Sequence, residues 1–375
     1  MRLGVLDIGS NTVHLLLVDA HPGARPSAYA DHKRSLSLLQ HQDEQGRIKA
    51  SGQDALVTFI QEAVTFAVAN GAEDMIAFCT SAIRESANGA EVLDRVTRET
   101  SVHLTELSGD QEAAMTYFAV RRWQGWDVGS ILNFDIGGGS FEIAYGTDEL
   151  PSHAVSIPLG AGRLTRDWLP ADPPTPKSIK KLRKHIRSTM DATAAGFPPM
   201  TAPVLVTGTS KTFRSLARIT GAAPLAAGVF VKRHLRIEDL KLWVHRMGAM
   251  SAKERAGLPG VSEVRAAQML AGGLAAEAAM ERFGVPMLEI CPWALREGLI
   301  MRRLDALVQE GILGQEAVRG VGNVRLNPDP MLPGFSAATM RRAASLSVRS
   351  SIESCLPNFF STWSMMSFAR LKSAT

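Results

Sequence analysis

Two segments of this chain carry the same order of residues around an aspartate. The first reads Asp-Ile-Gly-Ser-Asn at residues 7–11, and the second reads Asp-Ile-Gly-Gly-Gly-Ser at residues 135–140. An apolar run precedes and follows each segment, so each predicts a β-hairpin with the aspartate beside its turn. One such segment alone is typical of an ordinary tight turn. The pair favours a duplicated domain with a site in the cleft between the two copies.

The two predicted hairpins supply groups that bind phosphate and a divalent cation. Glycines remove Cβ atoms from a turn, so its backbone N–H groups can approach anionic oxygens closely. Asp7 and Asp135 face one another if the domain is duplicated. Mg²⁺ takes one or two carboxylates together with phosphate oxygens and waters. We therefore predict that Asp7 and Asp135 hold Mg²⁺, the alternative being that each aspartate caps its own turn.

Two glutamates are candidates for activating a water molecule. Glu112 follows Ser-Gly-Asp-Gln at 108–111, a capping box that opens a helix. The positive helix end should hold Glu112 ionised, and an ionised carboxylate can act as a general base. Compensation of the helix dipole would place a glutamate there equally well. Glu142 shares a strand face with Ser140, which suits a contact with metal or water, or else simple solvation. We assign the catalytic roles to Glu112, Asp135 and Glu142.

Other residues are candidates for binding phosphate oxygens. Arg84 follows a buried strand and could present its guanidinium to phosphate, although a surface ion pair would give the same pattern. A further turn at 208–210 leads into a helix N-terminus, which is a natural anion site. Arg163 and Lys211 are additional candidates. The predicted substrate-binding set is Gly9, Ser10, Asn11, Arg84, Gly137, Gly138, Gly139, Ser140, Gly208, Thr209 and Ser210.

Two further polar residues receive structural interpretations. His14 lies within the apolar run after the first turn, so we expect a core histidine whose hydrogen bonds are satisfied. Arg296 lies near the end of the patterned sequence, and we expect it to brace the two halves of the molecule rather than to touch a substrate.

The residues between these motifs predict alternating strands and helices. Apolar periodicity predicts helices over 52–70, 90–99, 177–195, 266–283 and 293–307, and the capping box begins another that ends near Gly125. Apolar runs predict strands at 75–79, 102–107, 155–158, 204–207 and 289–290. The order divides the chain into a first lobe (1–127), a second lobe (128–310) and a basic tail (311–375).

Composition places the chain among soluble globular proteins. It has 375 residues, 45% hydrophobic and 21% charged, which is enough for two domains with separate cores. Its 3 cysteines lack metal-ligand spacing and fit a reducing cytoplasm. No stretch approaches the ~20 apolar residues of a membrane helix. We therefore expect a cytoplasmic protein without a membrane partner.

The net charge of +4 comes from the end of the chain. Residues 311–375 hold seven Lys or Arg against three acids, which leaves 34 charges of each sign elsewhere. A balanced body does not indicate a nucleic-acid surface. The tail lacks sustained periodicity and is rich in Ser, Arg, Pro and Met, so we expect poor order, the alternative being a helical interaction segment.

Six motifs occur in an order that resembles a known family. They are Asp-Ile-Gly-Ser-Asn at 7–11, Thr-Ser-Ala-Ile-Arg at 80–84, Ser-Gly-Asp-Gln-Glu-Ala at 108–113, Asp-Ile-Gly-Gly-Gly-Ser-Phe-Glu at 135–142, Gly-Thr-Ser-Lys-Thr at 208–212 and Ala-Leu-Arg-Glu-Gly at 294–298. Over residues 1 to about 308 the chain resembles the exopolyphosphatase and guanosine-pentaphosphate phosphatase family, above all its short actinobacterial exopolyphosphatases.

The resemblance implies a fold and a chemistry. The fold is a two-lobed α/β structure of the actin-like, Hsp70-like and sugar-kinase type, a duplicated ribonuclease H-like domain. The chemistry is Mg²⁺-dependent, with Glu112 as the base and inorganic polyphosphate as the partner. Two features depart from the family. No His-Asp dipeptide is present, so we expect the C-terminal His-Asp domain of the long members to be absent. Lys211 stands where many relatives have glycine.

These observations leave three functions open. The first is release of terminal orthophosphate from polyphosphate, with short chains favoured. The second is the same hydrolysis on guanosine pentaphosphate, for which the sequence shows no base-reading signature. The third is a ppGpp sensor without turnover, which would not need water-activating carboxylates. A kinase of the same fold is disfavoured because no second-substrate element is visible. We expect ppGpp or pppGpp to act as inhibitor or substrate, and the protein to be a homodimer.

Overall fold

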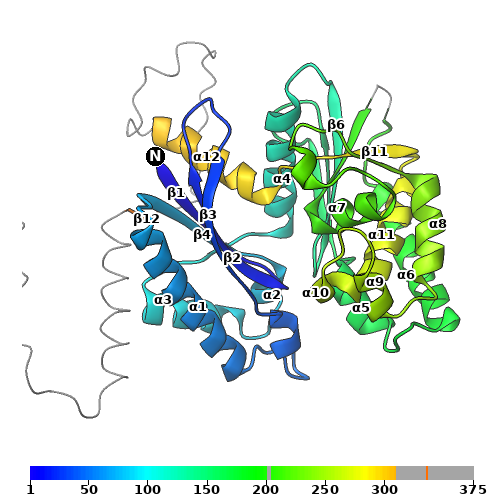
Figure 1. The fold of residues 1–375 in the computed structure, drawn as a ribbon, viewed down its shortest axis with the longest axis horizontal. Helices are drawn as coiled ribbons and strands as arrows, with labels where there is room; N and C mark the ends of the chain where they lie inside the picture. The colour runs from blue at the N-terminus through cyan, green and yellow to red at the C-terminus, as the bar shows by residue number, and fades with distance from the viewer. Residues whose placement is uncertain (201–203, 310–334, 337–375) are drawn as a thin grey trace, which may run out of the picture.

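The protein forms two lobes that lie side by side, each built on a mixed β-sheet (Figure 1). The structure is a computed structural model and describes residues 1–200, 204–309 and 335–336. The strands of the first sheet are β1 (Arg2–Ile8), β2 (Thr12–Asp19), β3 (Ser27–Ser35), β4 (Asp74–Cys79), β5 (Thr105–Glu106) and β12 (Phe335–Ser336). Those of the second are β6 (Ser130–Ile136), β7 (Phe141–Gly146), β8 (His153–Ile157), β9 (Val204–Thr209), β10 (His234–Arg236) and β11 (Met287–Ile290).

The two sheets repeat one topology. In the first sheet β1 pairs antiparallel with β2, β2 antiparallel with β3, and β1 parallel with β4. In the second sheet β6, β7, β8 and β9 pair in the same way. Asp7 and Asp135 occupy the same place, one residue before the end of the first strand. The predicted duplicated α/β fold is therefore confirmed.

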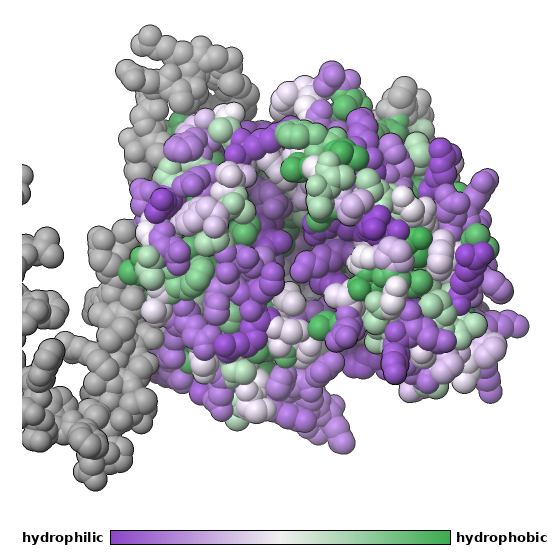
Figure 2. Space-filling view, viewed as in Figure 1, coloured by the Kyte–Doolittle hydropathy of each residue, from purple (hydrophilic) through white to green (hydrophobic). Residues whose placement is uncertain are grey.

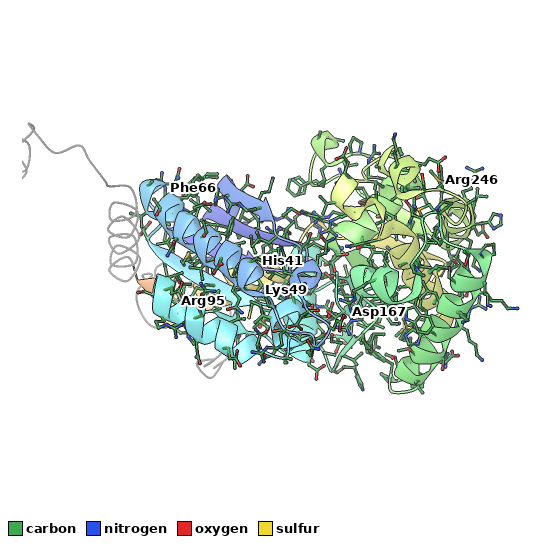
Figure 3. The ribbon with its side chains drawn as sticks, turned by 90° about the horizontal axis from the view of Figure 1, so that it is seen from below. His41, Lys49, Phe66, Arg95, Asp167 and Arg246 are labelled. Carbon is green, nitrogen blue, oxygen red and sulfur yellow. The ribbon has the colours of Figure 1, made fainter. Side chains whose placement is uncertain are left out.

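Helices cover both faces of each sheet. They are α1 (Ala50–Ala69), α2 (Ser81–Arg84), α3 (Gly89–Thr100), α4 (Gly109–Gln124), α5 (Ala161–Trp168), α6 (Pro176–Ala194), α7 (Ser210–Ile219), α8 (Ile237–Met247), α9 (Ala252–Ala256), α10 (Glu263–Ala266), α11 (Met269–Arg282) and α12 (Leu295–Gln309). In Figure 3, α1 and α3 lie side by side along the first lobe, where Arg95 of α3 reaches Asp54 of α1 at 2.6 Å.

Strand alternation decides which side chains turn toward the middle of the molecule. Leu6 and Ile8 of β1 pack with α1, whereas Leu3 and Val5 belong to a core shared with α4 and α12. Because side chains alternate along a strand, Asp7 continues the face of Leu3 and Val5. By the same alternation Asp135 continues the face of Ile131, which belongs to the same shared core. Both aspartates therefore face the region between the sheets.

Helices α4 and α12 cross in that region. The sequence division places α4 at the end of the first lobe, and the structure packs it against β6, β7 and β8 of the second. Helix α12 packs against α4 and β1, so the last helix returns to the first lobe. An added Cβ on Gly298 of α12 would lie 2.1 Å from the carbonyl oxygen of Met115 in α4. The absence of a side chain at Gly298 permits this close crossing.

Several predicted elements differ in extent. The helix predicted over 266–283 corresponds to α11 and begins only at Met269, and the strand predicted at 102–107 is reduced to β5. The sequence did not indicate β3, β10, α8 or α9. The predicted tail, 311–375, lies outside the described residues except for β12, which pairs antiparallel with Asp74 and Met75 of β4. No helix in the described part of the chain has the length and apolar character needed to cross a membrane.

Candidate functional site

A cavity of about 170 Å³ lies between the lobes, where the two hairpin turns meet the start of α4. Figure 2 shows the surface hollowed between the lobes. The lining residues are Asp7, Gly9, Ser10, Asn11, Thr12, Thr80, Ser81, Glu112, Thr116, Asp135, Gly137, Gly138, Ser140, Glu142, Arg265 and Leu295. The structure thus gathers all four predicted carboxylates from β1, α4, β6 and β7 around one space.

Asp135 and Glu142 are held by the second sheet. They are direct partners in the antiparallel register of β6 and β7. The Thr209 hydroxyl donates a hydrogen bond to Asp135 Oδ2 at 2.6 Å, and the Ser156 hydroxyl donates to Glu142 Oε1 at 2.8 Å. These hydrogen bonds fix the orientation of both carboxylates. Thr209 is fully buried, so it positions Asp135 from behind and does not line the cavity.

Glu112 enters the site from the first turn of α4. The capping box is present, since Ser108 accepts a hydrogen bond from the Gln111 amide and Gln111 Oε1 accepts from the Ser108 amide at 2.8 Å. Arg84 forms a short ion pair with Glu112 and donates to the carbonyl of Leu107 at 2.5 Å. The Arg84 guanidinium therefore contacts a carboxylate of the site in this structure.

The expectation that the helix end keeps Glu112 readily ionised is wrong. Burial, together with the charges of Asp135 and Asp7, raises the pKa of Glu112 to about 7 against the opposing effect of Arg84. Removal of a carboxylate from water disfavours its charged form, and here this effect exceeds the stabilisation by Arg84 and the helix end.

The other three carboxylates share this shift. Burial raises the pKa of Asp135 to about 6, although Thr209 opposes it. The pKa of Glu142 is raised by burial and by its repulsion from Glu112, and the pKa of Asp7 is raised mainly by burial. Four converging carboxyl groups whose charged forms are disfavoured by burial suit a divalent cation.

The donor set fits Mg²⁺ in one particular way. Asp7 and Asp135 offer hard carboxylate oxygens, which magnesium prefers. Among the described residues, no three His, Cys, Asp or Glu side chains converge closely enough to hold an ion by themselves. A magnesium ion here would complete its octahedron with waters and substrate oxygens, as it commonly does in phosphate-processing sites.

The two hairpin turns touch each other across the cleft. An added Cβ on Gly138 would lie 2.9 Å from Asn11 Nδ2 and 3.1 Å from Ser10 Cβ, both in the first turn. The Gly9 amide donates to Thr12 O at 3.1 Å, and the Gly137 amide donates to Ser140 O at 2.9 Å. These two amides thus bond within their own turns rather than pointing at a ligand.

The third predicted turn lies behind the site. Gly208 packs under the ring of Phe213, from which an added Cβ would be only 2.9 Å away. Ser210 begins α7 with a φ of 73°, and its buried hydroxyl has no hydrogen-bond partner among the described residues. Five of the predicted substrate-binding residues do not line this cavity, namely Arg84, Gly139, Gly208, Thr209 and Ser210. Arg84 and Ser140 line a neighbouring one.

A cluster of basic side chains lies near the two aspartates. We define this basic cluster as Lys211, Arg214, Arg265 and Arg296, of which Arg265 lines the cavity. Burial, together with the charges of the three arginines, lowers the pKa of Lys211 to about 8. Lys211 and Arg265 form no ion pair with any carboxylate in the described part of the chain. Such excess positive charge beside a cation site suits a polyanion.

Sequence reasoning missed Arg214 and Arg265 as site residues. Arg214 lies one turn beyond Ser210 in α7, and Arg265 belongs to the short helix α10. Neither residue belongs to a motif with fixed spacing that would distinguish it from the other arginines. The only available signal was the neighbouring Lys211, already a candidate.

His14 is not a core histidine. Its Nε2 lies 3.1 Å from Asp31 Oδ2, and its Nδ1 lies 2.5 Å from Arg296 Nη1. Burial, together with Arg296, lowers the pKa of His14 to about 4, so the ring is neutral at physiological pH. Arg296 also lies 3.9 Å from Asp7 Oδ2, so it links α12 to the first lobe.

Polar contacts join the lobes at the mouth of the cleft. Gln268 Nε2 donates to Asn11 Oδ1 at 3.0 Å, and Asn11 Nδ2 donates back to Gln268 Oε1 at 3.3 Å. Arg163 forms an ion pair with Glu85 and donates to the Gly139 carbonyl at 2.8 Å. Arg163 therefore acts between lobes, not as a group that lines the cavity.

Comparison with known proteins identifies relatives across most of the chain. A family model described as the Ppx/GppA phosphatase family matches residues 17–307. Exopolyphosphatase 1 of Mycobacterium tuberculosis is 48% identical over 328 residues, which cover 86% of this chain and 95% of the relative.

Solved structures share the fold. The PPX-GPPA enzyme of Aquifex aeolicus superposes with a TM-score of 0.67 at 26% identity, covering 80% of this chain and 99% of that one. An exopolyphosphatase from Cytophaga hutchinsonii superposes with a TM-score of 0.71 at 23% identity, covering 81% and 98%. The second likeness is one of fold alone.

Proposed function

We propose, from the premise that this chain belongs to the Ppx/GppA phosphatase family, that it is an exopolyphosphatase. The reaction is the hydrolysis of the terminal phosphate from inorganic polyphosphate. The observation that carries the proposal is the convergence of Asp7, Glu112, Asp135 and Glu142 on one cavity beside a basic cluster in which Lys211 and Arg265 have no carboxylate partner among the described residues. A polyanion and a divalent cation together would neutralise both sets of charges.

In the proposed reaction, Glu112 and Glu142 act on the attacking water molecule. Glu112 accepts a proton from a water molecule whose oxygen bonds to the terminal phosphorus. The bond between that phosphorus and the bridging oxygen breaks, and the bridging oxygen leaves with the electron pair on the shortened chain. The charge of Glu112 contributes to the raised pKa of Glu142, so the two carboxyl groups lie close together and Glu142 is placed to orient the same water.

The site must also stabilise the charge of the transferring phosphoryl group. Mg²⁺ held by Asp7 and Asp135 would neutralise charge on the phosphate oxygens. The basic cluster would bind the following phosphates of the chain, and the Ser10 and Ser140 hydroxyls line the space for the terminal one. Arg84 can turn from Glu112 to a phosphate oxygen, which would leave the buried Glu112 carboxylate more basic.

The cavity favours polyphosphate over guanosine pentaphosphate. A guanine base is commonly held by stacking on an aromatic ring and by hydrogen bonds to its edges. The lining of the cavity contains no aromatic side chain among the described residues. A ppGpp sensor without turnover is disfavoured, because burial of Glu112 and Glu142 serves no purpose in a pure phosphate binder.

Further parts of the proposal come from the sequence. We propose Mg²⁺ as the cofactor, a homodimer as the assembly and the cytoplasm as the location. We also propose that ppGpp and pppGpp compete with polyphosphate as inhibitors. The shared chemistry is their phosphate groups, which the basic cluster would attract.

A phosphate-release assay tests the proposed function. Purified protein with Mg²⁺ is given short polyphosphate, long polyphosphate or guanosine pentaphosphate at equal concentrations of terminal phosphate. We expect the fastest release from short polyphosphate, and competitive inhibition by ppGpp. Faster release from guanosine pentaphosphate than from either polymer would show that the substrate assignment is wrong.

A further inference from the structure

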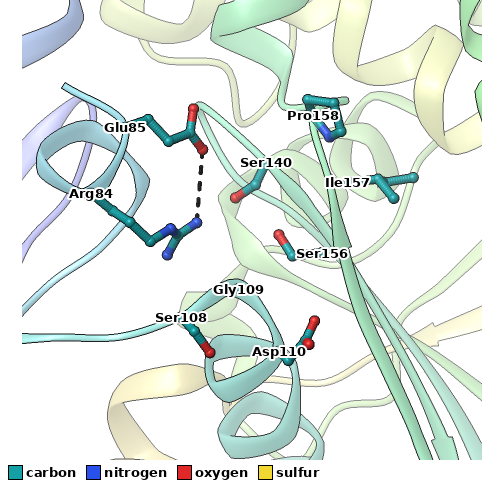
Figure 4. A pocket seen from close by; sticks show the side chains of 9 residues that line it. All are labelled: Arg84, Glu85, Ser108, Gly109, Asp110, Ser140, Ser156, Ile157 and Pro158. Carbon is teal, nitrogen blue, oxygen red and sulfur yellow. Dashed lines mark ion pairs between the residues drawn. The ribbon is translucent and has the colours of Figure 1, made fainter. Parts of the chain in front are cut away.

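A second cavity of about 310 Å³ lies beside the cleft, on the side of α4 where its first turn meets β8. Figure 4 shows its lining side chains, which are those of Arg84, Glu85, Ser108, Asp110, Ser140, Ser156, Ile157 and Pro158, together with Gly109. We call this space the side cavity. At ~30 Å³ per water in the liquid, its volume corresponds to roughly ten water molecules, which is room for a hydrated orthophosphate.

Only a thin wall of polar side chains separates the side cavity from the cleft. Ser140 lines both spaces. Arg84 lines the side cavity and forms an ion pair with Glu112, which lines the cleft. Ser156 lines the side cavity and donates to Glu142, which also lines the cleft. Rotation of Arg84 or Ser156 about its side-chain bonds would open the wall without movement of a helix or strand.

The charged side chains around the cleft determine which end of a bound polyphosphate lies beside Glu112. Arg296 Nε lies 3.9 Å from Asp7 Oδ2, and Arg265 lines the cleft together with Asp7 and Asp135. Arg84 forms its ion pair instead with Glu112. The basic cluster therefore lies on the aspartate side of the cleft, and Arg84 lies on the Glu112 side, next to the side cavity.

In-line displacement places the two products on opposite sides. The water activated by Glu112 attacks from the Glu112 side, and the leaving oxygen departs from the opposite face of the phosphorus. The shortened chain then remains with the basic cluster. The new orthophosphate lies beside Glu112, Arg84 and Ser140, against the wall of the side cavity.

We propose that the side cavity is the exit site for orthophosphate, and that phosphate leaves through it while the shortened chain stays in the cleft. This inference rests on the proposed function. Arg84, Ser140 and Ser156 supply a cation and two hydroxyls that can pass a small anion through the wall. Asp110 supplies negative charge at the same cavity and keeps the anion from binding tightly, whereas Glu85 is paired with Arg84 and Arg163.

Asp110→Lys tests the exit site. Asp110 is an exposed residue in the first turn of α4, so its replacement changes the charge of the side cavity and leaves the wall intact. The matched control is Asp239→Lys, an exposed aspartate in the first turn of α8, outside both cavities. Polyphosphate hydrolysis is measured at saturating polyphosphate with increasing orthophosphate, and orthophosphate binding is measured by calorimetry.

The proposal predicts two results. Added orthophosphate slows the wild-type protein even at saturating polyphosphate, because product and chain occupy different sites. Asp110→Lys lowers the inhibitory phosphate concentration by about fivefold, the effect of one favourable charge contact of about 1 kcal/mol in water. It tightens orthophosphate binding in calorimetry to the same degree, and Asp239→Lys changes neither quantity.

Three results would overturn the exit site. The first is that phosphate inhibition of the wild-type protein vanishes at saturating polyphosphate. The second is that Asp110→Lys and Asp239→Lys behave identically. The third is that Asp110→Lys raises kcat/KM for polyphosphate and leaves phosphate inhibition unchanged. The last result would make the side cavity an entrance for the polymer. Absence of any phosphate release by the wild-type protein would reject the proposed function instead, and calorimetry would still decide whether orthophosphate binds at the side cavity.

Discussion

The four carboxyl groups of the cleft share a raised pKa. Asp7, Glu112, Asp135 and Glu142 all have raised pKa values, chiefly because they are buried. A structural ion-pair network usually lowers the pKa of its acids, because each acid has a basic partner. Here the ion pairs Arg296–Asp7 and Arg84–Glu112 do not outweigh burial, and Lys211 and Arg265 have no carboxylate partner among the described residues. Binding of a metal–phosphate complex, as we propose, would neutralise both sets of charges.

Stability should therefore depend on pH and on Mg²⁺ together. The folded-state pKa values of Asp135 (about 6) and Glu112 (about 7) exceed the ordinary values of 3.8 and 4.5 for these side chains. The folded state thus binds more protons than the unfolded state, and the free energy of unfolding falls as pH rises through this window. Bound Mg²⁺ requires the charged carboxylates. We expect the Mg²⁺-induced rise in Tm to grow from pH 5 to pH 8, and an equal rise at both pH values would contradict it.

Replacement of either aspartate should weaken the metal site. Asp7→Asn and Asp135→Asn each exchange a charged oxygen ligand for a neutral one. We expect the Mg²⁺ concentration for half-maximal activity to rise at least about tenfold, because even loss of an outer ligand partner commonly costs that much. Asp94→Asn, an exposed residue of α3, is the control. Unchanged Mg²⁺ titrations in both cleft variants would place the metal elsewhere.

For single residues, the sequence predicted which carboxylates meet in the cleft but not their pKa values. The four carboxylates stand in motifs, and residue order sufficed to bring them together in one cleft. Their protonation did not follow from the sequence, because burial depends on the packing of both lobes around them. The helix dipole at Glu112 was predicted correctly as a feature but is outweighed by burial. Gly208 and Thr209 were predicted in a turn that binds phosphate, but they end strand β9 and do not line the cleft.

At the scale of elements, the crossing of α4 and α12 joins the catalytic helix to the end of the fold. Helix α4 carries Glu112 in its first turn, and its middle packs against α12. Helix α12 carries Arg296, which contacts His14 of β2. The position of Glu112 therefore depends on how closely the two helices approach at Gly298.

Gly298→Ala should loosen this crossing. The new Cβ would lie 2.1 Å from the backbone carbonyl oxygen of Met115, so one helix must move. We expect a loss of about 1–3 kcal/mol in the free energy of unfolding, as is typical of overpacking. Gly257→Ala is the control, because its Cβ would meet an ordinary contact at 3.4 Å. Denaturant unfolding of both variants gives the comparison, and equal stability would show that the crossing adjusts freely.

Elements with a buried apolar side were predictable, and exposed ones were not. Both hairpins, α1, α4 and α6 carry clear apolar periodicity or caps. Strand β3 was missed because most of its residues are exposed and polar, so the alternation that identifies a strand is absent. The predicted strand at 102–107 was longer than β5. Val102, Leu104 and Leu107 are buried and give the apolar pattern of a strand, but they lie outside β5.

At the scale of the whole molecule, two lobes close over the cleft and the chain continues beyond them. The Asn11–Gln268 amide pair and the Glu85–Arg163 ion pair span the lobes. All six motifs and both aspartates lie before residue 310. Of the predicted tail, the structure describes only β12, which adds a two-residue pairing to β4.

Truncation after Glu310 should leave the fold and the activity essentially unchanged. The truncated chain loses the pairing of β12, for which we expect a cost of about 1–2 kcal/mol at ~1 kcal/mol per hydrogen bond. It also loses the excess positive charge of residues 311–375, which should reduce non-specific binding of anions. Light scattering, Tm and kcat are compared with those of the full chain. Loss of a dimer or of most activity would show that the tail is an ordered part of the enzyme.

The most direct test of the account is the rate of phosphate release by Glu112→Gln. The amide keeps the shape of the side chain but cannot accept the proton of the attacking water. The matched control is Glu91→Gln in the first turn of α3, where the glutamate pairs with Arg47 at 2.7 Å, outside the lining of both cavities. We expect kcat on short polyphosphate to fall by about 10²–10⁴-fold in Glu112→Gln, with KM and polyphosphate binding preserved and the control unchanged. Turnover within a few-fold of the wild-type value would remove Glu112 from the reaction and contradict the account.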